Sequence, residues 1–119
     1  SGMKAMRKIL SNSRDTTAVF ACNDMMSLGA IREIFANGLR VPEDISIIGF
    51  DDVPLSQIAY PPLTTIAQPV DEIANISIDL LIEKISYKNY KKNSKEKKPD
   101  FKKIVLSTSL IERESCQKI

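Results

Sequence analysis

Two short apolar runs separated by an amphipathic segment constrain the fold of this 119-residue chain more than any other feature. The runs, residues 18–22 and 45–50, have the length and continuous hydrophobicity typical of strands covered on both faces in a parallel sheet. Between them, apolar residues repeat on one helical face from about residue 24 to 37, and Gly38 suits the left-handed position that ends a helix. This strand, helix, strand order predicts an α/β fold.

Polar residues follow each apolar run directly: Asn23 and Asp24 follow the first run, and Asp51 and Asp52 follow the second. A crossover through one helix is right-handed and makes the two strands parallel, so both polar pairs are expected at the carboxyl edge of the sheet. Ligands bind outside this edge in open α/β sheets. The sequence therefore predicts a ligand site there.

The remaining elements are predicted from periodicity and turn residues. A short amphipathic helix is expected at residues 3–10, and an irregular helix at 53–60 ends before two prolines that donate no backbone hydrogen bond. A strand is predicted at 63–66, a helix at about 69–87, and strands at 104–106 and 109–111. Residues 112–119 are predicted to form a polar tail.

The charge distribution is uneven although the formal net charge is only +2. Residues 88–103 hold eight lysines beside Glu96 and Asp100, so the basic character belongs to one segment. Such a run is able to bind phosphate backbones, but it lacks the interleaved arginines of a nucleic-acid groove. Its Asn, Ser and Pro residues favour a solvated loop instead.

The residues that are missing exclude several kinds of chemistry. The chain has no histidine, which excludes Cys/His zinc sites and the Ser/His/Asp triad. Cys22 and Cys116 form no CxxC pair, which favours free thiols in a reducing cytosol. No apolar run approaches the roughly 20 residues of a membrane helix, and no signal-peptide core opens the chain. We therefore expect a soluble, cytoplasmic protein with no cofactor, no metal and no membrane partner.

The acidic side chains at the sheet edge leave several roles open. Asp51 is suited to bind a ligand because an ionised carboxylate accepts two hydrogen bonds from adjacent hydroxyls, but spacing alone favours a helix cap or simply the end of the strand. Asn23 is suited either to contact a hydroxyl or to cap the helix that follows. Asp52 is expected to hold the turn, since successive side chains of an extended segment point in opposite directions.

The same acids suggest a minor alternative. Asp24, Asp51 and Asp52 together resemble the acidic cluster of a phosphoryl-accepting receiver domain or of a magnesium-dependent phosphatase. Such sites need a lysine after a later strand, and none stands in that position. The enzyme reading is therefore kept only as an alternative to a non-enzymatic binding module.

Residues 17–70 and 106–115 resemble a known family closely. The motifs ND, LGA, GLRVPEDIS, GFDD and PPLTT occur in order with family-like gaps, and the combination is similar to the effector-binding module of LacI/GalR transcription regulators. The segment SGMKAMRKIL resembles the helix before the ND strand, which favours a native Ser1-Gly2 over a cloning remnant. Sugar-binding proteins of transport systems share this fold and remain the main alternative, although they usually lack VPEDIS and PPLTT.

The resemblance implies a partial type I periplasmic-binding-protein-like module, with a parallel sheet flanked by helices and no enzymatic activity. It assigns residues 1–67 and 108–119 to the C-terminal subdomain of the family and residues 68–107 to the N-terminal one. The helix at about 69–87 would then need a partner for its apolar face. The implied partners are a small-molecule effector such as a sugar, a second copy of the chain, and operator DNA bound through a headpiece that these residues do not include.

The resemblance also assigns roles to individual residues. Asn23, Phe50 and Asp51 are the expected effector contacts, and Leu28 and Ile58 are the expected dimer contacts. Met25 is expected in the core. The resemblance, and not the spacing, favours an effector-binding role for Asp51 over the capping role.

Overall fold

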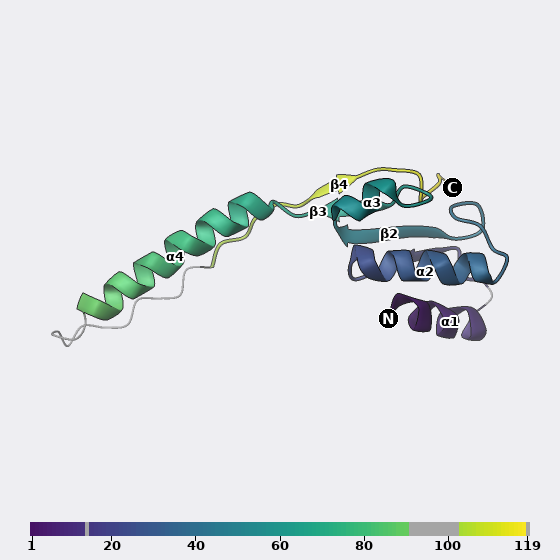
Figure 1. The fold of residues 1–119 in the computed structure, drawn as a ribbon, viewed down its shortest axis with the longest axis horizontal. Coiled ribbons are helices and arrows are strands. Elements are labelled where there is room, and N and C mark those ends of the chain that lie inside the picture. The colour runs from purple at the N-terminus through teal and green to yellow at the C-terminus, as the bar shows by residue number, and fades with distance from the viewer. Residues whose placement is uncertain (14, 91–102, 119) are drawn as a thin grey trace. The chain divides into compact units, whose positions relative to one another are not determined.

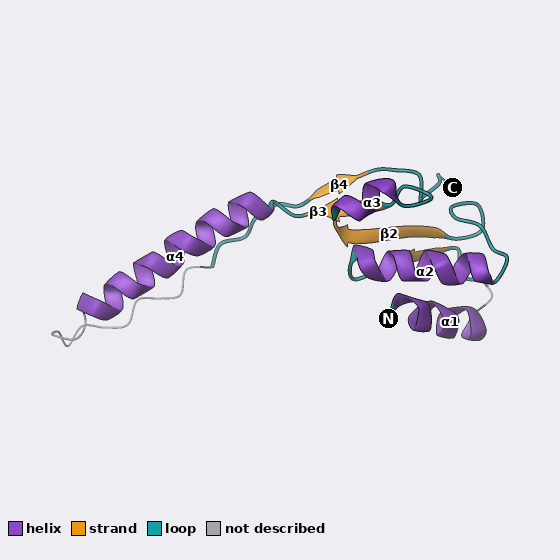
Figure 2. Cartoon of the chain, viewed as in Figure 1, coloured by secondary structure: helices purple, strands orange, loops and turns teal. Residues whose placement is uncertain are grey.

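The computed structural model describes residues 1–13, 15–90 and 103–118. Along this chain, helices and strands alternate (Figures 1 and 2). The helices are α1 (Gly2–Asn12), α2 (Asp24–Ala36), α3 (Pro54–Ile58) and α4 (Val70–Tyr90). The strands are β1 (Ala18–Phe20), β2 (Ser46–Asp51), β3 (Thr64–Ala67) and β4 (Ser109–Ile111). The chain divides into two compact units, Ser1–Gln68 with Thr108–Ile119, and Pro69–Ser107.

The first unit contains one four-stranded sheet in the order β1, β2, β3, β4. β1 pairs in parallel with β2, and β2 pairs in parallel with β3, whereas β4 runs antiparallel to β3. The α/β fold class is confirmed, with one antiparallel strand added to the predicted parallel sheet. The carboxyl ends of β1, β2 and β3 consequently meet at one edge.

β1 differs from the strand expected at residues 18–22. It is only three residues long and lies at the edge of the sheet, with Phe20 60% exposed. Only Val19 packs against the core. The expectation of cover on both faces is wrong for β1, because Val19 lies on the face that packs against the core, whereas Ala18 and Phe20 lie on the opposite face and are exposed.

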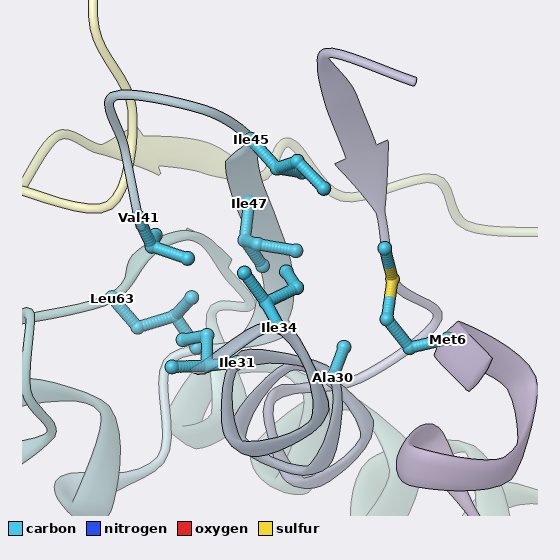
Figure 3. Close-up of a cluster of buried hydrophobic side chains, with 8 residues drawn as sticks. All are labelled: Met6, Ala30, Ile31, Ile34, Val41, Ile45, Ile47 and Leu63. Atoms are coloured by element: carbon cyan, nitrogen blue, oxygen red, sulfur yellow. The ribbon is translucent and has the colours of Figure 1, made fainter. Parts of the chain in front are cut away.

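A small apolar core fills the space between α2 and the sheet (Figure 3). α2 contributes Ala30, Ile31 and Ile34, which face Ile45 and Ile47 at the start of β2. Leu63, Val41 and Met6 close the cluster from three other segments. Burying a side chain of this size stabilises the fold by roughly 1.5 to 3 kcal/mol, so this cluster holds α2 on the sheet.

α1 packs closely along α2 (Figure 1) and contributes Met6 to the core. A methyl group added at Gly2 would collide with the main-chain carbonyl of Met26, so a residue without a side chain is required there. Arg7 donates from Nε and Nη2 to the two carboxylate oxygens of Glu33, at 2.8 and 2.9 Å. This pairing holds the pKa of the Glu33 carboxyl below its ordinary value.

A second ion pair closes the loop that leads into β2. Arg40 donates from Nε and Nη2 to the Asp44 carboxylate, at 2.9 and 2.8 Å, and its main-chain N–H donates to the same group at 2.8 Å. These bonds lower the pKa of Asp44 to about 2. The RVPED part of the recognised motif is therefore a self-closed turn.

The predicted polar tail is in fact part of the sheet region. Ser115 is fully buried, and its hydroxyl accepts from the Thr64 N–H at 2.8 Å and donates to the Ile47 carbonyl at 2.6 Å. Its own carbonyl accepts from the Ile47 N–H at 2.8 Å. Polarity therefore misled the prediction, because these polar groups satisfy the sheet and not solvent. The strand predicted at 104–106 is also not formed, whereas the one at 109–111 is confirmed as β4.

In the second unit, α4 extends three residues beyond the predicted end. Asp71 and Glu72 lie in its first turn, where negative charge suits the helix dipole. Large apolar side chains on α4 are more than one third exposed: Ile73, Ile78, Leu81, Ile82 and Ile85. These side chains are therefore exposed in the described part of the second unit. The lysine-rich loop falls mostly on residues 91–102, outside the described residues, and the assignment of the two units to family subdomains stays a prediction.

Candidate ligand site at the carboxyl edge of the sheet

The four polar residues predicted to border a site are brought to one edge of the first unit. Asn23 and Asp24 follow β1, and Asp51 and Asp52 end β2, which is parallel to β1. The last pair in register between β2 and β3 is Asp51 with Ala67, so Gln68 also emerges at this edge. The predicted convergence is confirmed, but the four side chains have different surroundings.

The backbone at Asp51 and Asp52 is strained. Their φ angles are 112° and 53°, in the positive-φ region that residues other than glycine rarely adopt. Each such residue costs on the order of 1 to 3 kcal/mol, and the conformation persists only where its surroundings hold it. Hydrogen bonds to the side chains of Asp24, Asp52 and Asp51 hold this backbone conformation.

Asp24 stabilises the turn at residues 51–53 through its buried carboxylate. It is fully buried, and its Oδ2 accepts from the Val53 N–H at 2.9 Å while its Oδ1 accepts from the Thr65 hydroxyl at 2.6 Å. A methyl group at Gly49 would collide with Asp24 Oδ1, so the glycine makes room for the carboxylate. Sequence reasoning missed this role, although a glycine inside an apolar strand is a signal of close approach.

Asp52 is fixed by hydrogen bonds from Arg113 and Ser56. Its Oδ1 accepts from Arg113 Nη2 at 2.7 Å and from the Ser56 hydroxyl at 3.2 Å. Arg113 also donates from Nη1 to the Leu63 carbonyl at 2.8 Å. Asp52 therefore holds the turn, as predicted. Arg113 was missed, because nothing in the local sequence of the presumed tail indicates its distant partner.

Asp51 keeps a carboxylate oxygen that is able to accept a hydrogen bond from a ligand. Its Oδ1 accepts from Gln68 Nε2 at 2.6 Å, and Oδ2 has no hydrogen-bond donor among the described residues. The side chain is half-buried. It makes no capping bond to α3, whose N-cap is Val53 and has no side-chain bond. The geometry is compatible with a ligand carboxylate, and that role stays a prediction.

Asn23 is the helix cap. Its Oδ1 accepts from the Met26 N–H at 2.8 Å, which satisfies one donor at the start of α2. Its Nδ2 has no acceptor among the described residues, so the amide remains able to donate to a ligand. Phe50, the third expected contact, is half-buried and pairs in register with Ile66.

The acidic-cluster alternative receives no support from this geometry. Both Asp24 oxygens accept protein hydrogen bonds, and Asp52 is paired with Arg113. Within the described ranges, no three acidic or cysteine side chains are arranged to hold a metal ion. The thiols of Cys22 and Cys116 are both free.

An apolar groove of about 320 Å³ lies between α2 and α3. Its lining residues are Leu28, Ile31, Arg32, Phe35, Leu55, Ala59 and Tyr60. Leu28 was an expected dimer contact, and the other one, Ile58, lies next to the groove residue Ala59 and is 79% exposed. Met25 was expected in the core, but it is 61% exposed, because it lies on the face of α2 opposite to the buried Ser27, Ile31 and Ile34. The expectation for Met25 is wrong.

The sheet order and the polar carboxyl edge together define a ligand-binding module of the periplasmic-binding-protein type. Residues 1–116 match the family described as periplasmic binding protein-like domain. The HTH-type transcriptional repressor PurR of Aliivibrio fischeri is 43% identical over 115 residues, which are 95% of this chain and 33% of that protein. The chain therefore belongs to the periplasmic binding protein-like domain family.

Solved structures agree with this placement. A complex of the transcriptional regulator CelR with cellobiose superimposes with a TM-score of 0.83 at 37% identity, covering 97% of this chain and 32% of that one. The Lac repressor dimer bound to operator and an anti-inducer gives 0.79 at 32% identity, covering 97% and 37%. The chain thus spans about a third of the length of the relatives it matches. None of the described helices is long and apolar enough to cross a membrane.

Proposed function

We propose that this chain senses a polyhydroxylated small molecule, such as a sugar, for a LacI-type transcription regulator. The observation that carries the proposal is the half-buried Asp51 carboxylate at the carboxyl edge of the sheet, whose Oδ2 has no donor among the described residues. A sugar hydroxyl would donate to this oxygen. The bound cellobiose of the similar CelR complex supports this ligand class.

Asn23 and Phe50 complete the proposed contacts. The Asn23 amide keeps Nδ2 available as a donor, while its Oδ1 is used by α2. An amide donor beside a carboxylate acceptor suits hydroxyl groups, which both donate and accept hydrogen bonds. Phe50 adds an apolar side chain of the kind that covers the carbon face of a sugar ring.

The role of the chain in the regulator would be non-enzymatic. Relatives such as PurR are named as transcriptional repressors, which favours a regulator over a transport protein of the same fold. DNA would be contacted by sequence outside these residues, and the protein would act in the cytoplasm without a cofactor. Subdomain closure around the effector would alter operator affinity, with residues 1–67 and 108–119 in one subdomain and 68–107 in the other.

A second copy of the chain is the proposed partner of the groove between α2 and α3. Its apolar lining and the exposed Ile58 form a surface that a soluble monomer rarely leaves uncovered. The similar Lac repressor is described as a dimer. Leu28 and Ile58 are the proposed contacts.

The test is a calorimetric titration of the protein, expressed with any coding sequence that flanks these residues, against cellobiose, lactose and ribose. At least one sugar should bind, and Asp51→Ala should weaken that binding about tenfold or more, since a bond to a charged group contributes roughly 1.5 to 3 kcal/mol. Asp15→Ala removes an exposed carboxylate and is the matched control. Equal affinity of wild type and Asp51→Ala would refute the assignment.

A further inference from the structure

Gln68 is the one side chain in the described structure that donates a hydrogen bond to Asp51. Its Nε2 lies 2.6 Å from Asp51 Oδ1, and both residues are half-buried. The register between β2 and β3 ends at Asp51 and Ala67, so Gln68 is the first residue beyond the paired strands. Its position is therefore set by the end of β3, to which it is directly joined.

A carboxylate without such a donor has little preference for one orientation. The terminal torsion of an aspartate side chain is broad, so a free carboxylate samples many orientations. A donor on Oδ1 restricts this rotation and leaves Oδ2 as the oxygen without a protein donor. Ordering the acceptor before binding reduces the entropy lost when a ligand binds.

We infer that Gln68 is a positioning residue, which fixes the Asp51 carboxylate so that Oδ2 faces the ligand site. The inference rests on the proposed function, because Asp51 is a ligand contact only there. An amide suits this role, because its N–H group donates to one carboxylate oxygen and leaves the other available. A lysine would also donate, whereas a glutamate would place a second carboxylate against the first.

Three substitutions distinguish positioning from plain stabilisation. Gln68→Ala removes the donor, Gln68→Glu replaces it with a repelling group, and Gln68→Lys keeps a donor. Gln57→Ala, on the exposed side of α3, is a matched truncation outside the site. With the sugar among cellobiose, lactose and ribose that wild type binds, Gln68→Ala should weaken affinity about tenfold and Gln68→Glu more.

Gln68→Lys should recover most of that affinity, and the thermal unfolding midpoints of all variants should stay close to that of Gln57→Ala. Recovery by a retained donor is a result that a purely structural role would not produce. Wild-type affinity in Gln68→Ala, or a loss that only follows a lowered unfolding midpoint, would overturn the inference while leaving the Asp51 assignment intact.

A ligand-free measurement separates failure of the inference from failure of the proposed function. In nuclear magnetic resonance spectra, one side-chain amide proton of Gln68 should be shifted downfield relative to those of Gln57, and Asp51→Ala should abolish the shift. If no sugar binds to wild type, the proposed ligand class fails, and this signal still shows whether Gln68 orders the Asp51 carboxylate. A Gln68 amide signal that stays unchanged in Asp51→Ala would overturn the positioning role of Gln68.

Discussion

Arg113 and Asp52 lie 61 positions apart in the sequence, yet Arg113 Nη2 donates to Asp52 Oδ1 across 2.7 Å. The same guanidinium reaches Ser56 Oγ and the Leu63 carbonyl. One side chain from the C-terminal segment thereby joins the strained turn after β2 to α3 and to the approach to β3. The candidate site depends on a residue that is distant in sequence.

Replacing Arg113 should destabilise the first unit. Arg113→Ala removes the charged donor to the Asp52 carboxylate and the side-chain donor to the Leu63 carbonyl, and the loss of a largely buried partner costs about 2 kcal/mol or more. Urea unfolding should show a lower midpoint with an unchanged slope. Lys118→Ala, an exposed truncation in the same segment, should unfold like wild type. Equal midpoints for both variants would contradict the role of Arg113.

Thr65 should be sensitive to loss of its hydroxyl and tolerant of loss of its methyl group. Thr65→Val keeps the volume but removes the donor to the buried Asp24 carboxylate, at a cost of roughly 1 to 3 kcal/mol. Thr65→Ser retains the donor and should lose less. Chemical denaturation of the two variants gives the comparison, and a more stable Val variant would show that Asp24 does not need this bond.

Gly2→Ala should loosen α1 from α2, because the added methyl group would meet the main-chain carbonyl of Met26, which cannot move aside as a side chain tip does. Backbone shifts of this kind cost about 1 to 3 kcal/mol. Gly29→Ala should cost less, since its methyl group would lie 3.1 Å from the nearest atom, Met3 N. Amide hydrogen exchange in α1 should be faster in Gly2→Ala. Equal exchange in the two variants would argue against the close contact.

Acid should weaken the loop before β2. The pKa of Asp44 is lowered to about 2 by hydrogen bonds from Arg40, so the unfolded chain binds the proton more readily than the folded one. Its contribution to the free energy of unfolding is therefore complete above about pH 4 and is lost as the pH falls towards about 2. Glu33, lowered by Arg7, acts in the same direction.

The check is the free energy of unfolding of wild type and Asp44→Asn between pH 7 and pH 2. Asp44→Asn should be less stable at pH 7 and should show a shallower decline. Asp15→Asn changes an exposed acid and should decline in parallel with wild type. Parallel declines for all three proteins would refute the contribution of the Arg40 pair.

The groove between α2 and α3 predicts the effect of a charge on self-association. Ile58→Asp places a carboxylate on the proposed contact surface and should shift sedimentation equilibrium towards monomer. Val105→Asp, which is also 79% exposed in the chain, tests whether any exposed apolar position has the same effect. Both side chains are exposed, so neither substitution should unfold the protein. Loss of association in both variants, or in neither, would count against this surface.

The sequence by itself determined the parallel pairing of β1 with β2 and the convergence of polar residues at one edge. These features follow from short-range patterns, namely apolar runs of strand length, one amphipathic helix and the handedness of the crossover. The motifs after each strand further indicated the family. Local spacing was enough for the strand pairing and the polar edge, whereas the family rested on the resemblance of the combined motifs.

The tertiary structure decided which polar side chain does what. Asn23 caps α2 and Asp24 is buried beneath Val53, although the two residues are adjacent and equally polar in the sequence. Ser115 and Arg113 belong to the sheet and the turn, and Phe20 is exposed at an edge. The partners of Asp24, Ser115 and Arg113 lie 29, 51 and 61 residues away in the sequence, and a local sequence pattern does not show which distant segment a side chain will meet.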